Sequence, residues 1–323
     1  MPSLISSYQS PKIYFHGHVQ TIAPALLRKV KGIEYERERI TTPDDDFLDL
    51  DWVKNDSNQL VIICHGLEGN TYRPYIKGMA RVFGQNSFSV LTWNYRGCSE
   101  EMNKKERFYH SGATDDLHTV INHAVSFNRY AQIHLVGFSL GGNLILKYLG
   151  EQKVALAREI KTAVTFSVPL DLHQSCLHIS KRSNLLYAKR FLKNLKHKIR
   201  SKASVMPEVF DLSKLNDVDN LFDFDNYFTA PLHGFDGALN YYHSCSAIRF
   251  VEHITIPTLI VNAKNDPFLP EACYPEALMT DLEYVFFEAP RHGGHCGFPS
   301  LNKQQYYWSE SRALAFVQEH MRK

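Results

Sequence analysis

A serine between two glycines is the most distinctive chemical feature of this 323-residue sequence. It lies in Gly137-Phe138-Ser139-Leu140-Gly141, between an apolar run typical of a strand and a stretch typical of a helix. A strand-to-helix turn of the G-x-S-x-G type exposes the serine hydroxyl above a sheet, where it can attack a carbonyl carbon. The pattern therefore predicts that Ser139 is a catalytic nucleophile rather than part of an ordinary glycine-containing loop.

Downstream of Ser139 the sequence carries an acid and a base, each at the end of a predicted strand. Asp266 directly follows one strand, and His295 lies in a glycine-rich loop after the last one. A serine hydroxyl needs such a base to take its proton and an acid to orient the base. A turn-forming role for Asp266 and a catalytic role for the neighbouring His292 are the alternatives. We predict a triad of Ser139, Asp266 and His295, with His292 helping to hold the loop.

Two backbone N–H groups near the predicted nucleophile are candidates for an oxyanion hole. Such a hole stabilises the negative charge that develops on a carbonyl oxygen under attack. Leu140, which directly follows the serine, is expected to supply one N–H group. Leu67, in the loop 65–69 after the first core strand, is expected to supply the other, whereas His65 of that loop is expected to be structural.

Other histidine and cysteine patterns are weaker. His16 and His18 form an HxH pair without a matching set of Cys, Asp or Glu residues, so we expect no metal site. His110 and Asp115 have the H-x4-D spacing noted in some acyltransferases, although a helix N-terminus explains the acid as well. Cys296 is expected to be a packed thiol. No glycine-rich nucleotide fingerprint follows a strand, so the sequence predicts no cofactor.

Short apolar runs that alternate with helical stretches indicate the fold class. The runs lack strict alternation, which is typical of strands buried on both faces. Alternating strands and helices predict an α/β fold with a mostly parallel sheet, whose sites form at the carboxyl ends of strands. With an antiparallel entry hairpin, we expect eight strands and helices on both faces. The runs are 60–64, 88–93, 133–136, 163–168, 258–262 and 284–287, the hairpin is 33–40 and 47–53, and helices are expected at 114–127 and 140–151.

The span 171–250 interrupts this alternation and is interpreted as a helical cap within a single domain of residues 1–323. The core then comprises about 12–170 and 251–323. Residues 181–202 contain nine Lys or Arg and no acid, beside an apolar seam at helical spacing. A solvated basic face is one explanation of this helix, and peripheral contact with an anionic membrane is the other. The seam consists of Leu185, Ala188, Leu192, Leu195 and Ile199.

Composition and charge exclude several classes of function. A formal net charge of +2 gives no general attraction to nucleic acid. Six scattered cysteines without CxxC spacing, in a chain with 44% hydrophobic residues, indicate a reducing compartment, and we expect a cytoplasmic protein. Residues 1–12 lack the apolar core of a signal peptide, and no apolar run approaches the roughly 20 residues of a membrane-spanning helix.

Several segments together resemble the YheT-like esterases, the AB hydrolase-4 branch of the α/β-hydrolase superfamily. The resemblance extends from about residue 12 to residue 300 and implies an α/β-hydrolase fold with Ser139, Asp266 and His295 as the triad. This sequence departs from the family pattern at Asn70, where Ser is common, and at Glu100, where Gly is common. The matching segments are 17–22 (HLQTI in the family), 65–69 (HGLEG), 94–99 (N-[FY]-R-G-C-S), 110–112, 137–143 and 294–298.

The sequence as a whole predicts a serine hydrolase that cleaves carboxylic esters through an acyl-enzyme. The resemblance implies short- to medium-chain acyl esters or lipid-like esters as substrates. Tyr227, Phe228, Tyr241 and Tyr242, at the end of the cap, are expected to line an apolar acyl pocket. Two other classes stay open, namely an acyltransferase that uses the same triad and a non-catalytic binding protein on a hydrolase fold.

Overall fold

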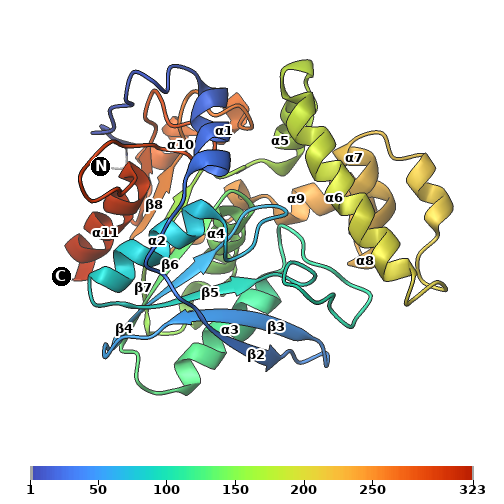
Figure 1. Cartoon of the computed structure of the whole chain (residues 1–323), viewed down its shortest axis with the longest axis horizontal. Helices are drawn as coiled ribbons and strands as arrows, with labels where there is room; N and C mark the ends of the chain where they lie inside the picture. Colours follow the sequence, from blue (N-terminus) through green and yellow to red (C-terminus); the bar gives the residue numbers. More distant parts are fainter. Residues whose placement is uncertain (1–2, 322–323) are drawn as a thin grey trace.

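A mostly parallel sheet of nine strands forms the centre of the computed structural model, which describes residues 3–321 (Figure 1). Its strands are β1 (Ser3–Leu4), β2 (Glu36–Thr41), β3 (Phe47–Val53), β4 (Gln59–Cys64), β5 (Ser89–Asn94), β6 (Gln132–Phe138), β7 (Ile160–Phe166), β8 (Thr258–Val261) and β9 (Val285–Glu288). They lie in the order β1-β9-β8-β7-β6-β4-β5-β3-β2. Strand β3 is antiparallel to β2 and β5, and the other neighbours are parallel. The eight expected strands are confirmed, and the short edge strand β1 is an addition.

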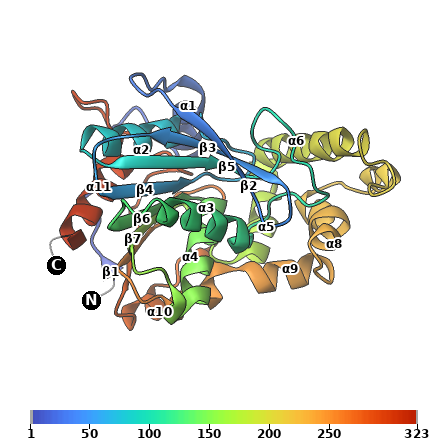
Figure 2. The same cartoon turned by 90° about the horizontal axis from the view of Figure 1, so that it is seen from below.

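Helices cover both faces of the sheet, as predicted (Figure 2). One face carries α2 (Pro74–Gln85) and α11 (Trp308–Met321), and the opposite face carries α3 (Thr114–Ser126) and α4 (Leu140–Gln152). Successive strand residues pack alternately into two buried apolar clusters, one under each helical layer. The remaining helices of this part are α1 (Gly17–Leu27) and α10 (Glu276–Thr280).

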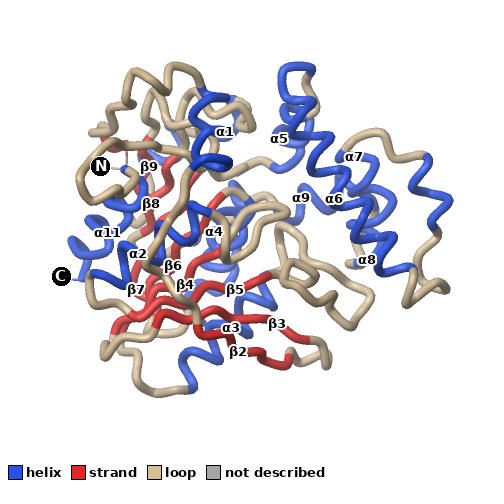
Figure 3. Tube along the Cα trace, viewed as in Figure 1, coloured by secondary structure: helices blue, strands red, loops and turns tan. Residues whose placement is uncertain are grey.

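Between β7 and β8 the chain forms a separate group of helices beside the sheet (Figure 3). The group contains helices and loops, and two apolar clusters hold it together, each with a residue from outside this segment, Phe268 in one and Phe108 in the other. Its helical character agrees with the expectation for the span 171–250. The helices are α5 (Leu172–Ile179), α6 (Leu185–Ala203), α7 (Leu221–Phe224), α8 (Ala230–Leu232) and α9 (Gly237–Cys245).

A basic side chain of helix α6 forms hydrogen bonds with the core of the protein. Lys202 is buried and donates to the carbonyl and side-chain oxygens of Asn103, both at 2.8 Å. Of the predicted apolar seam, Ala188 and Ile199 are buried, whereas Leu185 at the start of the helix is 40% exposed. The inner side of α6 is therefore a packing surface, and its outer side remains basic.

Arg96, in the turn after β5, is the centre of a buried ionic network. Its side chain is 1% exposed and lies 2.9 Å from the carboxylates of Asp44 and Asp46 and 2.7 Å from that of Asp116. Burial lowers the pKa of Arg96, but the carboxylates of Asp116 and Asp44 raise it above its ordinary value. The network joins the β2–β3 turn to α3, and Asp46 also accepts a hydrogen bond from Asn103 at 2.7 Å.

Replacing Arg96 by methionine should lower the free energy of unfolding by about 3–5 kcal/mol, because the buried carboxylates of Asp46 and Asp116 lose their common cation. At roughly 2–4 °C per kcal/mol, the apparent Tm in a thermal scan falls by about 6–20 °C. Arg96→Lys keeps the charge with a single nitrogen and should lose less. Lys54→Met, which breaks an exposed pair with Glu36, is the control and should change Tm little. Equal Tm values for Arg96→Met and Lys54→Met would contradict this role.

Candidate active site

Ser139 occupies the sharp turn between β6 and α4. Its φ of 53° and ψ of −120° lie in a region that L residues rarely adopt. The flanking glycines allow the turn, because a Cβ on Gly141 would lie 2.5 Å from the carbonyl oxygen of Cys64, and one on Gly137 would lie 2.5 Å from that of Gly141. The Ser139 N–H donates to the carbonyl oxygen of Phe166 at 2.8 Å, which ties the turn to β7. This is the geometry that the G-x-S-x-G pattern predicts.

His295 and Asp266 form a buried, hydrogen-bonded pair. The Nδ1 atom of His295 lies 2.9 Å and 3.1 Å from the two carboxylate oxygens of Asp266. Asp266 follows β8, His295 follows β9, and the ring of Phe268 packs 4.1 Å from the imidazole. Burial lowers the pKa of His295, but the Asp266 carboxylate and the neighbouring Cys296 together raise it, so the pKa lies above its ordinary value. The pair can therefore stabilise an imidazolium ion.

Ser139 and His295 line the same two cavities, which meet beside them. The structure thus brings the three predicted residues together at the carboxyl ends of β6, β8 and β9. Within residues 3–321, hydrogen bonds join His295 to Asp266, but none joins His295 to Ser139. Such contacts often tighten only when substrate is bound, so this spacing is compatible with catalysis.

Helix α1 holds the loop that carries His295, a role that the sequence patterns do not assign. The side-chain oxygen of Gln20 accepts hydrogen bonds from the Gly293 N–H at 2.8 Å and from Asn265 at 2.9 Å. The Thr21 hydroxyl accepts from the His295 N–H at 2.9 Å. Gln20 is completely buried. Gln20 and Thr21 belong to the segment 17–22, and its resemblance to the HLQTI motif was the only sign in the sequence that these residues matter to the site.

Two N–H groups beside Ser139 are free to bind a ligand. In the loop after β4, the N–H groups on either side of Leu67, those of Gly66 and Glu68, donate to tyrosine hydroxyls at 3.0 and 2.9 Å. In the part of the chain that the structure describes, no acceptor is bonded to the N–H group of Leu67 or of Leu140. Leu140 is the first residue of α4, where N–H groups have no partner within the helix.

The first cavity, called the cap-side cavity, lies between the sheet and the helices of 171–250. Its walls are mostly apolar and include Phe228, Tyr241 and Tyr242, as expected. The expectation is wrong for Tyr227, which is 37% exposed and does not line the cavity. Adjacent residues of a helix point in different directions, so Tyr227 faces away from the wall that Phe228 forms.

The second cavity, called the α1-side cavity, lies between α1, the loop after β4 and α6. Three arginines contribute to its walls, namely Arg28, Arg73 and Arg190. Arg28 is paired with Glu310, whereas in the described part of the chain no carboxylate pairs with Arg73 or Arg190. This cavity is therefore the more polar and the more positive of the two.

Lys198 links α6 to the loop that carries Leu67. Its Nζ atom lies 2.7 Å from the Glu68 carboxylate and 3.1 Å from the Cys98 sulfur. The Tyr109 hydroxyl donates to the same Glu68 oxygen at 2.7 Å. The helical span is thus bonded directly to the loop beside Ser139, a connection that the count of basic residues in α6 does not reveal.

His65 and His292 occupy structural positions. His65 is buried, and burial lowers its pKa to about 3, so its ring stays neutral. One ring nitrogen lies 2.8 Å from the Gly66 carbonyl oxygen and the other accepts from the Tyr95 N–H at 3.3 Å. His292 lies on the same loop as His295, and its ring contacts the side chain of Asn265 at 3.4 Å.

The residues of the two weaker patterns lie in different surroundings. His110 lines the cap-side cavity, whereas Asp115 pairs at the surface with Arg107 at 2.7 Å, so the H-x4-D residues do not act on one another. His16 caps α1, and His18 contacts the Tyr187 hydroxyl at 3.0 Å. Among the described residues, no three His, Cys, Asp or Glu side chains are grouped so as to hold a metal ion.

Known proteins with similar sequences are named as ester-cleaving enzymes. The Escherichia coli (strain K12) protein "Putative esterase YheT" is 33% identical over 306 residues, which cover 91% of this chain and 88% of that protein. Human "Phospholipase ABHD3" is 26% identical over 307 residues, covering 92% and 75%. Human "Monoacylglycerol lipase ABHD2" is 26% identical over 322 residues, with the same coverage of 92% and 75%.

Solved structures and a family profile agree with these relatives. The Pyrococcus furiosus esterase Pf2001 has a TM-score of 0.60 at 15% identity, covering 91% of this chain and 96% of that one. Est1E from Butyrivibrio proteoclasticus, with ferulic acid bound, has a TM-score of 0.58 at 15% identity, covering 90% and 100%. These two likenesses concern the fold. The profile of the alpha/beta hydrolase fold matches residues 59–300. This match, with the similarity to YheT over most of its length, shows that the chain belongs to the α/β-hydrolase family, in the branch that contains YheT.

Proposed function

We propose that this esterase-type α/β-hydrolase cleaves carboxylic esters with Ser139 as nucleophile, His295 as general base and Asp266 as the acid that orients His295. The observation that carries the proposal is the strained turn of Ser139 beside the buried His295–Asp266 pair, at the junction of two cavities. The names of the relatives, which are esterase, phospholipase and monoacylglycerol lipase, agree with an ester as substrate.

In the proposed mechanism, the free nitrogen of His295 takes the hydroxyl proton of Ser139 as its oxygen bonds to the ester carbonyl carbon. The N–H groups of Leu67 and Leu140 stabilise the oxyanion. The imidazolium, held by Asp266, then gives its proton to the leaving alcohol as the ester C–O bond breaks. Water attacks the acyl-enzyme with His295 again as base, and the acid is released.

The two cavities suit the two halves of an ester. We assign the acyl group to the apolar cap-side cavity and the alcohol to the α1-side cavity with its arginines. Short- to medium-chain acyl esters and lipid-like esters both fit this division. In this proposal, residues 171–250 are the cap of a single domain whose core is about 12–170 and 251–323.

The test is hydrolysis of p-nitrophenyl esters of rising acyl length by the purified protein. We expect a maximum at one length, because helices of 171–250 form part of the walls of the cap-side cavity and limit the acyl chain that fits there. Product analysis with added alcohol separates hydrolysis from the alternative acyl transfer, which would yield mainly the transferred ester at low alcohol concentration. The absence of ester cleavage and of fluorophosphonate labelling in folded protein would favour a binding protein instead.

The outer side of α6 is the surface that we propose contacts an anionic membrane. Lys189 and Lys193 are exposed there beside Leu186, which is 83% exposed, a combination typical of helices that lie on lipid. No helix within residues 3–321 has the length and hydropathy to cross a bilayer. We expect sedimentation with phosphatidylserine vesicles at low salt and loss of this binding in a Lys189→Glu, Lys193→Glu variant. Equal binding by both proteins would contradict the proposal.

A further inference from the structure

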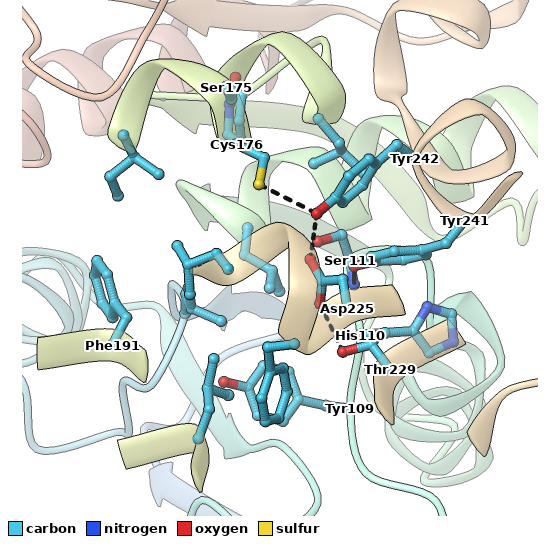
Figure 4. A pocket seen from close by; sticks show the side chains of 18 of the residues that line it. Tyr109, His110, Ser111, Ser175, Cys176, Phe191, Asp225, Thr229, Tyr241 and Tyr242 are labelled. Carbon is cyan, nitrogen blue, oxygen red and sulfur yellow. Dashed lines mark hydrogen bonds between the residues drawn. The ribbon is translucent and has the colours of Figure 1, made fainter. Parts of the chain in front are cut away.

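A single carboxylate interrupts the apolar wall of the cap-side cavity. Asp225 follows α7 and begins a π-helical turn, Asp225–Thr229, and its side chain lines the cavity (Figure 4). Turns of this kind are rare and are found frequently at functional sites. Phe224, the last residue of α7, and Phe228 of the π-helical turn are buried among apolar side chains. The carboxylate is therefore an exception in its surroundings.

Two hydroxyl groups donate to the Asp225 carboxylate, one to each oxygen. The Thr229 hydroxyl and the Tyr242 hydroxyl both lie at 2.6 Å, and the Tyr242 hydroxyl is also 3.2 Å from the Cys176 sulfur. Figure 4 shows this chain of contacts along one side of the cavity. A carboxylate has about four acceptor positions, so these donors leave about half of them unused.

No cation balances this carboxylate within the described part of the chain, where Asp225 forms no ion pair. The other acid near the cavity, Glu68, is paired with Lys198. Burial raises the pKa of Asp225 to about 6, and the hydrogen bonds from Thr229 and Tyr242, which favour the ionised carboxylate, oppose this rise. An ionised group in apolar surroundings is costly unless it is paired or hydrogen-bonded, so a further donor would stabilise it.

The contacts of Asp225 differ from those of an aspartate that caps a helix. A structural aspartate in a helical region typically caps backbone N–H groups, as Asp171 does for the Gln174 N–H at the start of α5. The contacts of Asp225 are instead side-chain hydroxyls of the cavity wall. A carboxylate that faces a substrate cavity with unused acceptor positions is placed to bind a donor group of the substrate.

We propose that Asp225 is a specificity-determining residue that binds a hydrogen-bond donor, a hydroxyl or an ammonium group, carried by the acyl part of the substrate. This inference rests on the proposed function, because it uses the assignment of the acyl group to the cap-side cavity. It predicts a preference for acyl chains that bear such a group at a defined position over the corresponding unsubstituted chains.

The test compares p-nitrophenyl octanoate with octanoates that carry one hydroxyl at successive chain positions, and with one amino-substituted ester for each preferred position. For the wild type, we expect one or two adjacent positions to be preferred. Asp225→Leu should lower the ratio of kcat/KM for the preferred ester over octanoate by about 10- to 100-fold, the range of a hydrogen bond to a charged group. A better amino ester would identify ammonium as the favoured donor.

Tyr242→Phe is the matched control, because it removes a neutral hydroxyl from the same cluster and leaves the carboxylate in place. It should keep the preference that Asp225→Leu loses. If Asp225→Leu does not fold, the isosteric Asp225→Asn takes its place with a smaller expected loss. Fluorophosphonate labelling and cleavage of p-nitrophenyl acetate report whether each variant keeps an intact site.

Equal ratios in the wild type and in a folded Asp225 variant, across all positions, would overturn this inference. That result differs from a failure of the proposed function, in which no ester of the series is cleaved in a manner that depends on Ser139.

Discussion

Ser139→Ala should lower kcat for p-nitrophenyl ester hydrolysis by about 10⁶-fold, the scale seen when the nucleophile of a serine protease triad is removed. The substitution deletes the only oxygen that can form the proposed acyl-enzyme, while the turn around it is held by backbone contacts. The Ser139 N–H bond to Phe166 and the close-packed glycines do not depend on the side chain. The variant should therefore fold, and steady-state kinetics measure a loss of chemistry.

Ser167→Ala is the control for this substitution. Ser167 lies just after the neighbouring strand β7 and also has a positive φ of 54°, and its hydroxyl accepts from the Cys296 N–H at 2.8 Å. Its loss removes one hydrogen bond from the loop of His295, so we expect a small decrease in kcat. A fluorophosphonate probe should label the wild type and Ser167→Ala but leave Ser139→Ala unlabelled. Near-equal activity of Ser139→Ala and the wild type would contradict the proposed mechanism.

The strands and the chemically active loops could be predicted from the sequence because each has a local signal. Apolar runs of four to six residues identify buried strands, and the residues after them identify the reactive edge of the sheet. Ser139, Asp266 and His295 each follow such a run, so their positions in the fold follow from the order of strands. The G-x-S-x-G pattern is specific because it describes a strained turn that needs small neighbours on both sides.

Other parts of the site depend on contacts between segments that are distant in the sequence. Gln20 binds a loop 273 residues away, and Lys198 contacts Glu68 across 130 residues. No periodicity or short motif encodes such pairs. Lys198 is one of nine Lys or Arg residues in 181–202, and nothing in the sequence distinguishes it from the others. The proposed cap illustrates the same limit, because Tyr227 and Phe228 are both aromatic and only the packing of the helix decides which one lines the cavity.

Asp266→Asn should lower kcat/KM by about 10⁴-fold and shift its pH dependence, the two effects of removing an orienting carboxylate. His295 must be neutral to take the Ser139 proton, so the rate falls as pH decreases through its pKa. Because Asp266 raises this pKa against the effect of burial, the midpoint in the wild type should lie above the ordinary value of about 6.5. The asparagine variant loses the negative charge, and its midpoint should move to lower pH.

The pH profile of kcat/KM distinguishes this role from a structural one. A side chain that only supported the loop would lower the rate at all pH values without moving the midpoint. Asp236→Asn removes the same charge from an exposed position of the proposed cap and should change neither the rate nor the midpoint. The isosteric asparagine keeps the shape of the site, but it leaves the imidazole without the charge that stabilises its protonated form during ester cleavage. A wild-type midpoint below 6.5, or one that Asp266→Asn leaves in place, would contradict the assignment of Asp266 to the triad.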